Sequence, residues 1–424
     1  MKTLAEAIGG AKRIIGGPFG SKLTTRDYSD CGVPVIRGSN MEINGRWVGG
    51  EFAYVSQQKL DRDLATNVAR PGNIIVTQRG TLGQVSIIPD KSVISTYVVS
   101  QSQMAIDIDH KIANRDFVYY YLRSSEFTEH SQRQTIQTGV PHINLGILRE
   151  APATFPPLCE QHEIATTLGA LDNKIELNRK TAATLEEMAR ALYRSWFVDF
   201  DPVYARAESR APSHMDAATA ALFPDTFGEN GLPMGWRISS IGQELEILDS
   251  RRIPLSKTQR AQKAGNIPYY GATSIMDYVN QPLFDEELLL IGEDGSVVRS
   301  NGTPFTQYIW GPSWVNNHAH VLKGRRFSVP QLKCYFDQAE ISGFVNGAVQ
   351  AKLNQANMKK IPFVEAPPNV HSAFDAAVVT WFAGIRLAID QNRTLASLRD
   401  TLLPRLMSGE LRVPAAREMI EEIA

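Results

Sequence analysis

The sequence predicts an α+β protein in which two mixed α/β globules are separated by a pair of long antiparallel helices. Three observations support this prediction. Two segments carry a heptad pattern of apolar residues, other segments recur along the chain, and short strand-like runs bounded by glycine and proline fill the remaining regions. A duplicated unit explains the order globule, helix, globule, helix most simply, so we expect a pseudo-twofold internal repeat.

The first long helix is expected at residues 157–203. Its apolar seam runs in alternating steps of four and three residues from Ile164 to Trp196, and Asn178 is its one polar member. A seam of this length is typical of a helix that packs along another helix.

The second long helix is expected at residues 367–410, where the seam reappears when 214 is added to each position. Asn392 then corresponds to Asn178, Arg399 is the one seam position unsuited to an apolar contact, and Pro404 is expected to kink or end the helix. In an antiparallel pair the two asparagines would meet and fix the register. The alternative is two solvent-facing asparagines on separate helices.

The repeat sets the expected domain boundaries. Ala151-Pro152 matches Ile361-Pro362 at an offset of 210, and the segment from Gly32 to Gly38 resembles the one from Asn266 to Gly271. The expected parts are a first globule (1–156), the first long helix (157–203), a connector rich in alanine, serine, proline and glycine (204–235), a second globule (236–366), the second long helix (367–410) and a tail (411–424).

Composition argues against several classes of protein. The 44 basic and 45 acidic side chains nearly cancel, although the two globules are mildly basic and the first helix with its connector is acidic. Cys31, Cys159 and Cys334 lie far apart, which argues against a disulfide framework and a structural zinc site. No apolar core follows Lys2, and no window approaches about 18 uninterrupted apolar residues. A cytoplasmic location is therefore expected.

No catalytic residue and no metal ligand is predicted. The sequence contains no phosphate-binding loop, dinucleotide fingerprint, zinc-protease motif or amino-methyltransferase signature. His318 and His320 would share one strand face and could begin a metal site, but no third ligand is evident, so a recognition-loop or core role is favoured. Asp199 and Asp201 are better explained by capping or a partner contact than by acid–base chemistry.

Residues 168–179 (LGALDNKIELNR) and 184–203 (TLEEMARALYRSWFVDFDPV) closely resemble the specificity subunit of type I restriction–modification systems. The segments 17–23 and 402–411 also look like that family, and the resemblance follows the whole chain in order. The central block is highly specific, whereas the globules match loosely.

The resemblance implies two target-recognition domains, each reading one half of a bipartite, interrupted target in double-stranded DNA. The long helices would act as a ruler and as a dock for two methyltransferase (modification) subunits, and restriction/translocase subunits would complete the complex. The chain itself would be non-catalytic. S-adenosylmethionine, ATP and magnesium would belong to the partner subunits.

Candidate DNA contacts follow from side-chain chemistry. Arginine suits guanine, asparagine and glutamine suit adenine, and lysine, arginine, serine and threonine suit phosphates. The expected contacts in the first globule are Lys22, Arg37, Ser39, Asn40, Arg79 and Thr81. Those in the second are Arg251, Arg252, Lys257, Tyr270, Arg299, Asn301, Asn316, Asn317 and His318. Gln101 and Gln103 alternate with apolar residues and are also expected to face DNA.

Trp196, Phe197 and Phe200 cluster at the end of the first helix. If exposed, they would favour a methyltransferase dock; the alternative is packing against the second globule. Two rival functions remain open at this point. A protein-interaction scaffold would show no salt-sensitive DNA binding, and a stand-alone nuclease would cut DNA alone in the presence of a metal ion.

Overall fold

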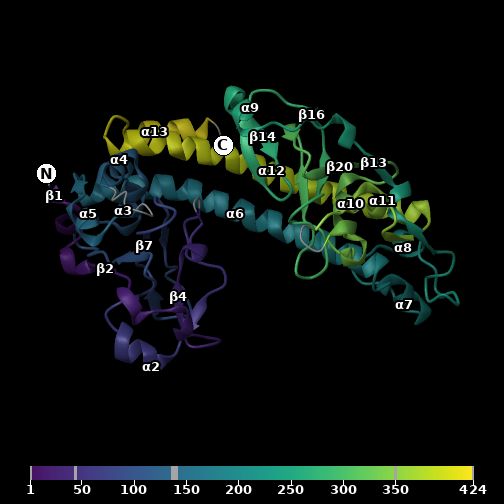
Figure 1. The fold of residues 1–424 in the computed structure, drawn as a ribbon, viewed down its shortest axis with the longest axis horizontal. Coiled ribbons are helices and arrows are strands. Elements are labelled where there is room, and N and C mark those ends of the chain that lie inside the picture. Colours follow the sequence, from purple (N-terminus) through teal and green to yellow (C-terminus); the bar gives the residue numbers. More distant parts are fainter. Residues whose placement is uncertain (1, 43–44, 135–141, 348–350, 423–424) are drawn as a thin grey trace. The chain divides into compact units, whose positions relative to one another are not determined.

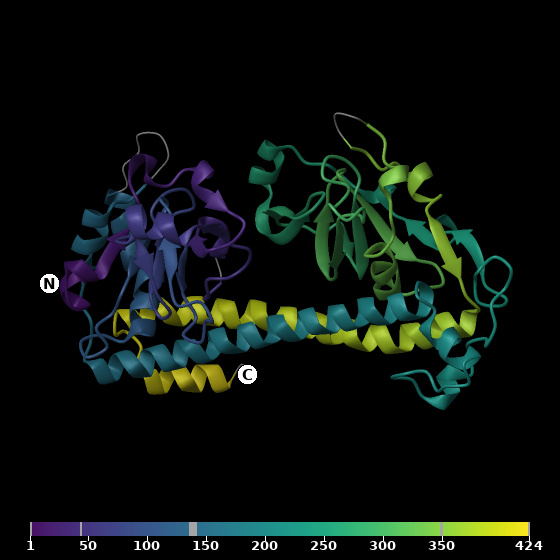
Figure 2. The same cartoon turned by 90° about the horizontal axis from the view of Figure 1, so that it is seen from below.

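A computed structural model describes residues 2–42, 45–134, 142–347 and 351–422. The chain divides into a first unit, Met1–Asn178 with Gln391–Ala424, and a second unit, Arg179–Asp390. Each unit contains a globule and half of each long helix (Figures 1 and 2). The first unit is therefore discontinuous in sequence, whereas the second is contiguous.

The globule of the first unit contains two larger sheets. One has the order β2-β10-β7-β8, entirely antiparallel, and the other the order β3-β5-β4-β9-β6, in which only β4 and β9 are parallel. The strands are β2 (Ile14–Gly16), β3 (Tyr28–Ser29), β4 (Val33–Ile36), β5 (Ala53–Val55), β6 (Val68–Ala69), β7 (Ile74–Thr77), β8 (Val85–Ile87), β9 (Tyr97–Val99) and β10 (Gln103–Ile106).

The globule of the second unit repeats this topology. Its sheets have the orders β13-β20-β17-β18 and β15-β14-β19-β16, and again one pair, β14 and β19, is parallel. The strands are β13 (Leu245–Ile247), β14 (Ala264–Tyr270), β15 (Ile275–Val279), β16 (Phe284–Asp285), β17 (Leu288–Gly292), β18 (Thr306–Ile309), β19 (Pro312–Val315) and β20 (Ala319–Gly324). The predicted fold class and internal repeat are confirmed.

A two-stranded antiparallel sheet joins the beginning and end of each globule. In the first unit β1 (Lys2–Thr3) pairs with β11 (Pro152–Ala153), and in the second β12 (Arg237–Ser240) pairs with β21 (Pro362–Glu365). Chain entry and exit are therefore adjacent in both globules.

Shorter helices complete the two units. In the first unit these are α1 (Leu4–Ala7), α2 (Gln57–Lys59), α3 (Arg115–Arg123), α4 (Ser125–Gln134), α5 (Leu145–Glu150) and α13 (Val413–Glu421). In the second they are α7 (Asp201–Ala207), α8 (Ala217–Ala220), α9 (Lys257–Gln262), α10 (Val329–Phe336) and α11 (Gln355–Met358). Asn144 caps α5 and Asn354 caps α11, so the repeat extends to the capping residues.

The long helices α6 (Leu158–Phe197) and α12 (Pro368–Met407) each contain 40 residues. Their first residues, and likewise their last residues, lie 210 positions apart in the sequence, the offset already seen in the flanking segments. The offset of 214 expected within the helices is therefore wrong by about one helical turn, because a heptad seam matches itself almost as well after a shift of four residues. Helix α12 also continues past Pro404 rather than ending there.

Asn178 contacts the residue that precedes Asn392, and the meeting of the two asparagines stays a prediction. Asn178 is buried, but its side chain donates to Oε1 of Gln391 at 3.1 Å. Oδ1 of Asn392 is buried without a hydrogen-bond partner among the described residues. At the offset of 210 Asn178 corresponds to Ala388, so the two asparagines are not equivalent positions.

The unsuited seam residue Arg399 has a specific partner. Its side chain is 4% exposed, and its guanidinium donates to Oδ1 of Asp172 on α6 at 2.7 Å. The Tyr120 hydroxyl donates to the other oxygen of Asp172 at 2.6 Å. A buried ion pair thus joins α6 and α12 in the first unit.

Helix α12 is apolar over part of its length. One 18-residue window has a mean hydropathy of 1.4, enough by length and composition to span a membrane. Val370, Phe374, Val378, Phe382 and Ile385 are buried in the core of the second unit, so helix packing accounts for the apolar character of these positions.

Candidate nucleic-acid interface

In the first unit, four loops meet at one edge of the two sheets. They follow β2, β4, β7 and β9, which end at Gly16, Ile36, Thr77 and Val99. Backbone hydrogen bonds tie the loops together, because Ser100 donates to Ile36, Gly17 donates to Gln103, and Gln78 donates to Ser102. We call this surface the recognition edge of the first unit.

Several predicted DNA contacts are exposed on this edge. Lys22, Ser39, Arg79 and Thr81 are exposed, and Arg37 is half-buried. Nε of Arg37 is buried and has no hydrogen-bond partner among the described residues. Arg37 therefore places a guanidinium at the edge with unused donor capacity.

Two side chains that we expected to face DNA hold loops together instead. Asn40 is 2% exposed and donates to the carbonyl oxygens of Gly49 and Glu51 at 3.0 and 2.9 Å. Gln103 is 1% exposed and accepts from Ser100. Gln101 is exposed, but its amide is also engaged, since it donates to the carbonyl oxygens of Gly20 and Leu23. A buried loop backbone needs such partners, which is why these polar residues point inward.

The second unit has a corresponding recognition edge, formed by the loops that follow β13, β14, β17 and β19. Lys257, Asn301, Asn317 and His318 are exposed in or beside these loops. Arg251 is also exposed after β13, but its guanidinium lies toward the start of β17, where it donates to Glu286 and to the carbonyl oxygen of Leu283. Half-buried Arg299 lies over the ring of Phe305 at 5.4 Å.

Arg251 and His318 carry acidic partners. Arg251 donates to Glu286 at 2.8 Å, and Nδ1 of His318 lies 2.6 Å from Oδ1 of Asp294. Both side chains are about half exposed, so the partners hold them in place without covering them.

Three predicted contacts of the second unit are structural. Tyr270 belongs to a small core cluster, and Asn316 is 3% exposed, where its side-chain oxygen accepts from the backbone N–H of His318 at 2.8 Å. The Arg252 side chain is 12% exposed and donates to Glu293 and to the carbonyl oxygen of Ala319. The sequence did not reveal these roles because buried and exposed loop residues share the same polar composition.

Arg252 belongs to an ion cluster with Asp249, Glu293 and His320. Nδ1 of His320 lies 2.6 Å from Asp249 and Nε2 lies 2.7 Å from the carbonyl oxygen of Leu353. Burial opposes ionisation of Asp249, but hydrogen bonds from His320 and the Val321 N–H, with the charge of Arg252, outweigh it and lower the pKa of Asp249.

The three acidic and imidazole groups of this cluster could approach one metal ion. Both nitrogens of His320 are already engaged, and the Arg252 guanidinium lies between the carboxylates. The cluster therefore fits a closed structural network, in agreement with the favoured core role for His320. His318, in contrast, precedes β20 and lies outside it.

The expectation of an exposed aromatic cluster is wrong for Trp196 and Phe197. They are 5% and 2% exposed and contact Phe374 of α12, with ring centroids 5.7 and 5.3 Å apart, while Phe200 is half-buried against Trp236. The packing alternative holds because these rings complete the core between the helix pair and the second globule.

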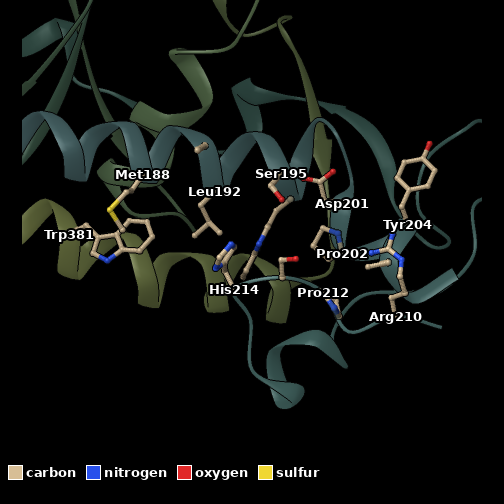
Figure 3. Close-up of a pocket in the computed structure, with 14 residues that line it drawn as sticks. Met188, Leu192, Ser195, Asp201, Pro202, Tyr204, Arg210, Pro212, His214 and Trp381 are labelled. Atoms are coloured by element: carbon tan, nitrogen blue, oxygen red, sulfur yellow. The ribbon is translucent and has the colours of Figure 1, made fainter. Parts of the chain in front are cut away.

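An apolar groove lies beside these rings. It has a volume of about 550 Å³ and is lined by Met188, Ala191, Leu192, Ser195 and Trp196 of α6, Asp201, Pro202, Tyr204 and Ala205 of α7, Arg210, Pro212, Ser213 and His214 of the following loop, and Trp381 of α12. Figure 3 shows Met188 over Trp381 at one end and Tyr204 with Arg210 at the other. We call it the α6–α7 groove.

Two globules of one topology, each with basic side chains in the loops at one edge of its sheets, are the arrangement expected of a protein that contacts nucleic acid. The chain belongs to the family of the type I restriction modification DNA specificity domain, whose model matches residues 19–187 and 233–368. It is the non-catalytic DNA specificity subunit of a type I restriction–modification system, in which the cofactors belong to partner subunits.

Known proteins of the same kind align over most of the chain. The type I restriction enzyme MjaIX specificity subunit of Methanocaldococcus jannaschii is 23% identical over 391 residues, covering 86% of this chain and 84% of its own length. The HindI specificity subunit of Haemophilus influenzae is 23% identical over 378 residues, and the alignment covers 75% of this chain and 82% of the length of that subunit. A crystal structure of the type I S subunit from M. genitalium is 17% identical, covers 96% of this chain and 99% of its own, and has a TM-score of 0.49.

Proposed function

We propose that each recognition edge reads one half of a bipartite, interrupted sequence in double-stranded DNA. The observation that supports this is the repeated strand order, which places exposed donor side chains at the same edge of both globules. Arginine and asparagine at such an edge can form bidentate hydrogen bonds to guanine and adenine, and lysine can neutralise phosphates.

The proposed contacts are the predicted residues that are exposed or half-buried. In the first unit these are Lys22, Arg37, Ser39, Arg79 and Thr81, and in the second Lys257, Arg299, Asn301, Asn317 and His318. Arg251 is left out because its partners Glu286 and Leu283 lie before the start of β17, away from the recognition edge. Asn40, Arg252, Tyr270 and Asn316 support the loops that carry them.

The experiment is single-molecule detection of methylated adenines in cells that carry this gene and its neighbouring methyltransferase gene, compared with cells in which this gene is deleted. A bipartite motif that disappears on deletion supports the proposal and gives the target. Methylation that persists unchanged would contradict it and favour the scaffold function.

Replacing Arg79 with alanine is expected to relax sequence preference in one half of the motif only. Loss of a bidentate base contact costs about 1–3 kcal/mol, a factor of roughly 5–150 in affinity. Asn317→Ala is expected to relax the other half. The measurement is competition binding of the assembled methyltransferase complex to DNA with each half randomised.

Arg62 provides the matched control, because it is an exposed arginine beyond the opposite end of the same sheets, in the segment that follows β5. Arg62→Ala should leave both halves unchanged. If Arg79→Ala behaved like Arg62→Ala, Arg79 would not be a base contact.

We further propose that the helix pair docks two methyltransferase subunits, that restriction/translocase subunits join them, and that the complex is cytoplasmic. The α6–α7 groove is the candidate dock in the second unit. In the first unit, α13 lies along α6 through Arg412–Glu160 and Arg417–Thr167, and its Val413 and Ala416 belong to the same core as Leu402 and Leu406.

The groove corresponds to the surface that α13 covers. At the offset of 210, Leu402 and Leu406 correspond to Leu192 and Trp196, which line the groove. An amphipathic helix of this chain thus covers the equivalent surface in the first unit. A helix of a partner subunit is the matching occupant in the second.

Introducing a charge into the groove is expected to weaken assembly. Met188 is 44% exposed, so Met188→Glu should leave the fold intact while placing an unpaired carboxylate in a partner interface, at a cost of several kcal/mol of binding. The measurement is the Kd between this subunit and the methyltransferase subunit. Met234→Glu is the control, since Met234 is 54% exposed and lies outside the groove. Equal affinities for the two variants would reject the dock.

A further inference from the structure

Phe19 is exposed at the recognition edge of the first unit. It is 71% exposed, and it is the one phenylalanine among the described residues that lies largely in solvent. An exposed aromatic ring forfeits about 1.5–3 kcal/mol that burial would contribute.

The loop is held rigidly on both sides of Phe19. Gly17 lies so close to the carbonyl oxygen of Ser100 that a Cβ there would approach it to 1.8 Å, and Pro18 is buried with its φ fixed by its ring. After Phe19, Gly20 has a φ of +63°, which favours glycine.

The far side of the loop is anchored by Gln101 and Leu23. Gln101 donates to the carbonyl oxygens of Gly20 and Leu23 at 2.7 and 2.8 Å, and Leu23 is 5% exposed in a core cluster. The exposure of Phe19 is therefore a fixed feature of the loop, since buried groups on both sides direct the ring outward.

The surroundings of Phe19 match a DNA contact. Exposed Lys22 lies three residues away, and the loops that carry Arg37 and Arg79 are joined to this loop through Ser100, Ser102 and Gln103. Cationic side chains around one projecting apolar ring are the arrangement of proteins that insert a side chain between base pairs while contacting the flanking phosphates.

We propose that Phe19 inserts at a base step within the half-site read by the first unit and partly unstacks it. The inference rests on the proposed recognition edge and adds a residue that deforms the DNA. Methylation of a base requires that the base leave the stack, and a wedge nearby lowers the energy needed for that step. The second unit carries a counterpart, since Ile253 is 50% exposed in the loop that follows β13, the strand that corresponds to β2.

The test uses the assembled methyltransferase complex and a series of target DNAs. Each DNA carries a single 2-aminopurine, placed in turn at each position of the half-site except the methylated adenine. Fluorescence should rise at one step when the wild-type complex binds, because 2-aminopurine brightens when it unstacks. Phe19→Ala should abolish the rise and weaken binding by about 5- to 150-fold, the range for loss of one base-stacking contact. Phe19→Leu should retain most of the rise, since leucine also acts as an apolar wedge.

Val93→Ala is the matched control, because Val93 is fully exposed and lies in the loop between β8 and β9 at the opposite end of the sheets. If Phe19→Ala behaves like Val93→Ala while Lys22→Ala weakens binding and reduces its salt dependence, the wedge is refuted and the recognition edge stands. If Lys22→Ala and Arg79→Ala also leave DNA binding unchanged, the proposed edge itself is refuted.

Discussion

Replacing Arg399 with alanine is expected to destabilise the first unit by about 3–5 kcal/mol, because it removes the guanidinium that forms an ion pair with the buried carboxylate of Asp172. Burial disfavours a charged guanidinium, but Asp172 and Asp400 outweigh that effect and raise the pKa of Arg399. Arg399 is therefore ionised in the folded protein. Tyr120 remains as a donor to Asp172, but a neutral hydroxyl does not balance a buried charge.

The second unit supplies the design for a rescue variant. At the offset of 210, Asp172 corresponds to Phe382 and Arg399 to Ala189, and both of these residues are buried in an apolar core. Combining Arg399→Ala with Asp172→Phe and Tyr120→Phe is expected to recover most of the lost stability, since a packed apolar pair commonly replaces a buried ion pair without loss.

Hydrogen exchange during urea denaturation is the appropriate measurement, because peptides from the two units report separately. Arg399→Ala should lower the midpoint for peptides of the first unit and leave those of residues 236–366 unchanged. If Arg399→Ala alone were as stable as wild type, the ion pair would contribute nothing to the pairing of the helices.

The second unit is expected to lose about 3 kcal/mol of stability as the pH falls from about 6.5 to about 4, through His371. Burial lowers the pKa of His371 from its ordinary 6.5 to about 4, with a smaller contribution from the charge of Arg326. Across this interval the unfolded chain binds a proton that the folded chain excludes. Acidification therefore favours unfolding, and the stability is regained above pH 6.5.

The hydrogen bonds of His371 explain why the folded state keeps the ring neutral. Its Nε2 accepts from the backbone N–H of Ala366 at 3.2 Å, so the site where a second proton would bind is occupied. Nδ1 donates to the side-chain oxygen of Gln331 at 2.6 Å, and the amide of Gln331 donates to Asp375 at 3.1 Å. The ring of Phe197 stacks on the imidazole at 5.1 Å.

The measurement is the free energy of unfolding of the second unit at several pH values for wild type and His371→Gln. The variant should be less stable at pH 7, because it loses the stacking contact, but its stability should fall less steeply between pH 6.5 and 4. His110→Gln, at an exposed histidine, is the control. Equal slopes for wild type and His371→Gln would exclude His371 as the titrating group.

The architecture could be predicted from the sequence because periodicity and repetition are local properties. Helix α6 begins one residue from the predicted start, and the duplicated globules follow from paired motifs such as Ala151-Pro152 and Ile361-Pro362. The offset within the helices could not be settled, because a heptad seam is nearly unchanged by a shift of four residues. The ends of the two helices resolve it, since both differ by 210 residues. The Asp172–Arg399 pair had a signal in the sequence, a charged residue at or beside a seam position in each helix.

The recognition edges could be predicted only in part. Composition identifies polar loop residues, but it does not distinguish Arg79, which is exposed, from Asn40, which holds the loop between β4 and β5. Burial depends on which backbone groups in the loop need partners, and that is decided by tertiary structure. Phe19 was missed for the opposite reason, since an apolar residue in a loop is ordinarily assigned to the core.

The discontinuity of the first unit has a consequence for synthesis on the ribosome. Residues 179–390, which form the whole second unit, separate the two parts of the first, so about 212 residues must be translated before Gln391–Ala424 emerges. At roughly 5–20 residues per second this takes about 10–40 s. Throughout that time Ile164, Leu168 and Leu171 lack their partners on α12, and the nascent chain carries an open apolar seam. The part of the protein that is made first is thus completed last.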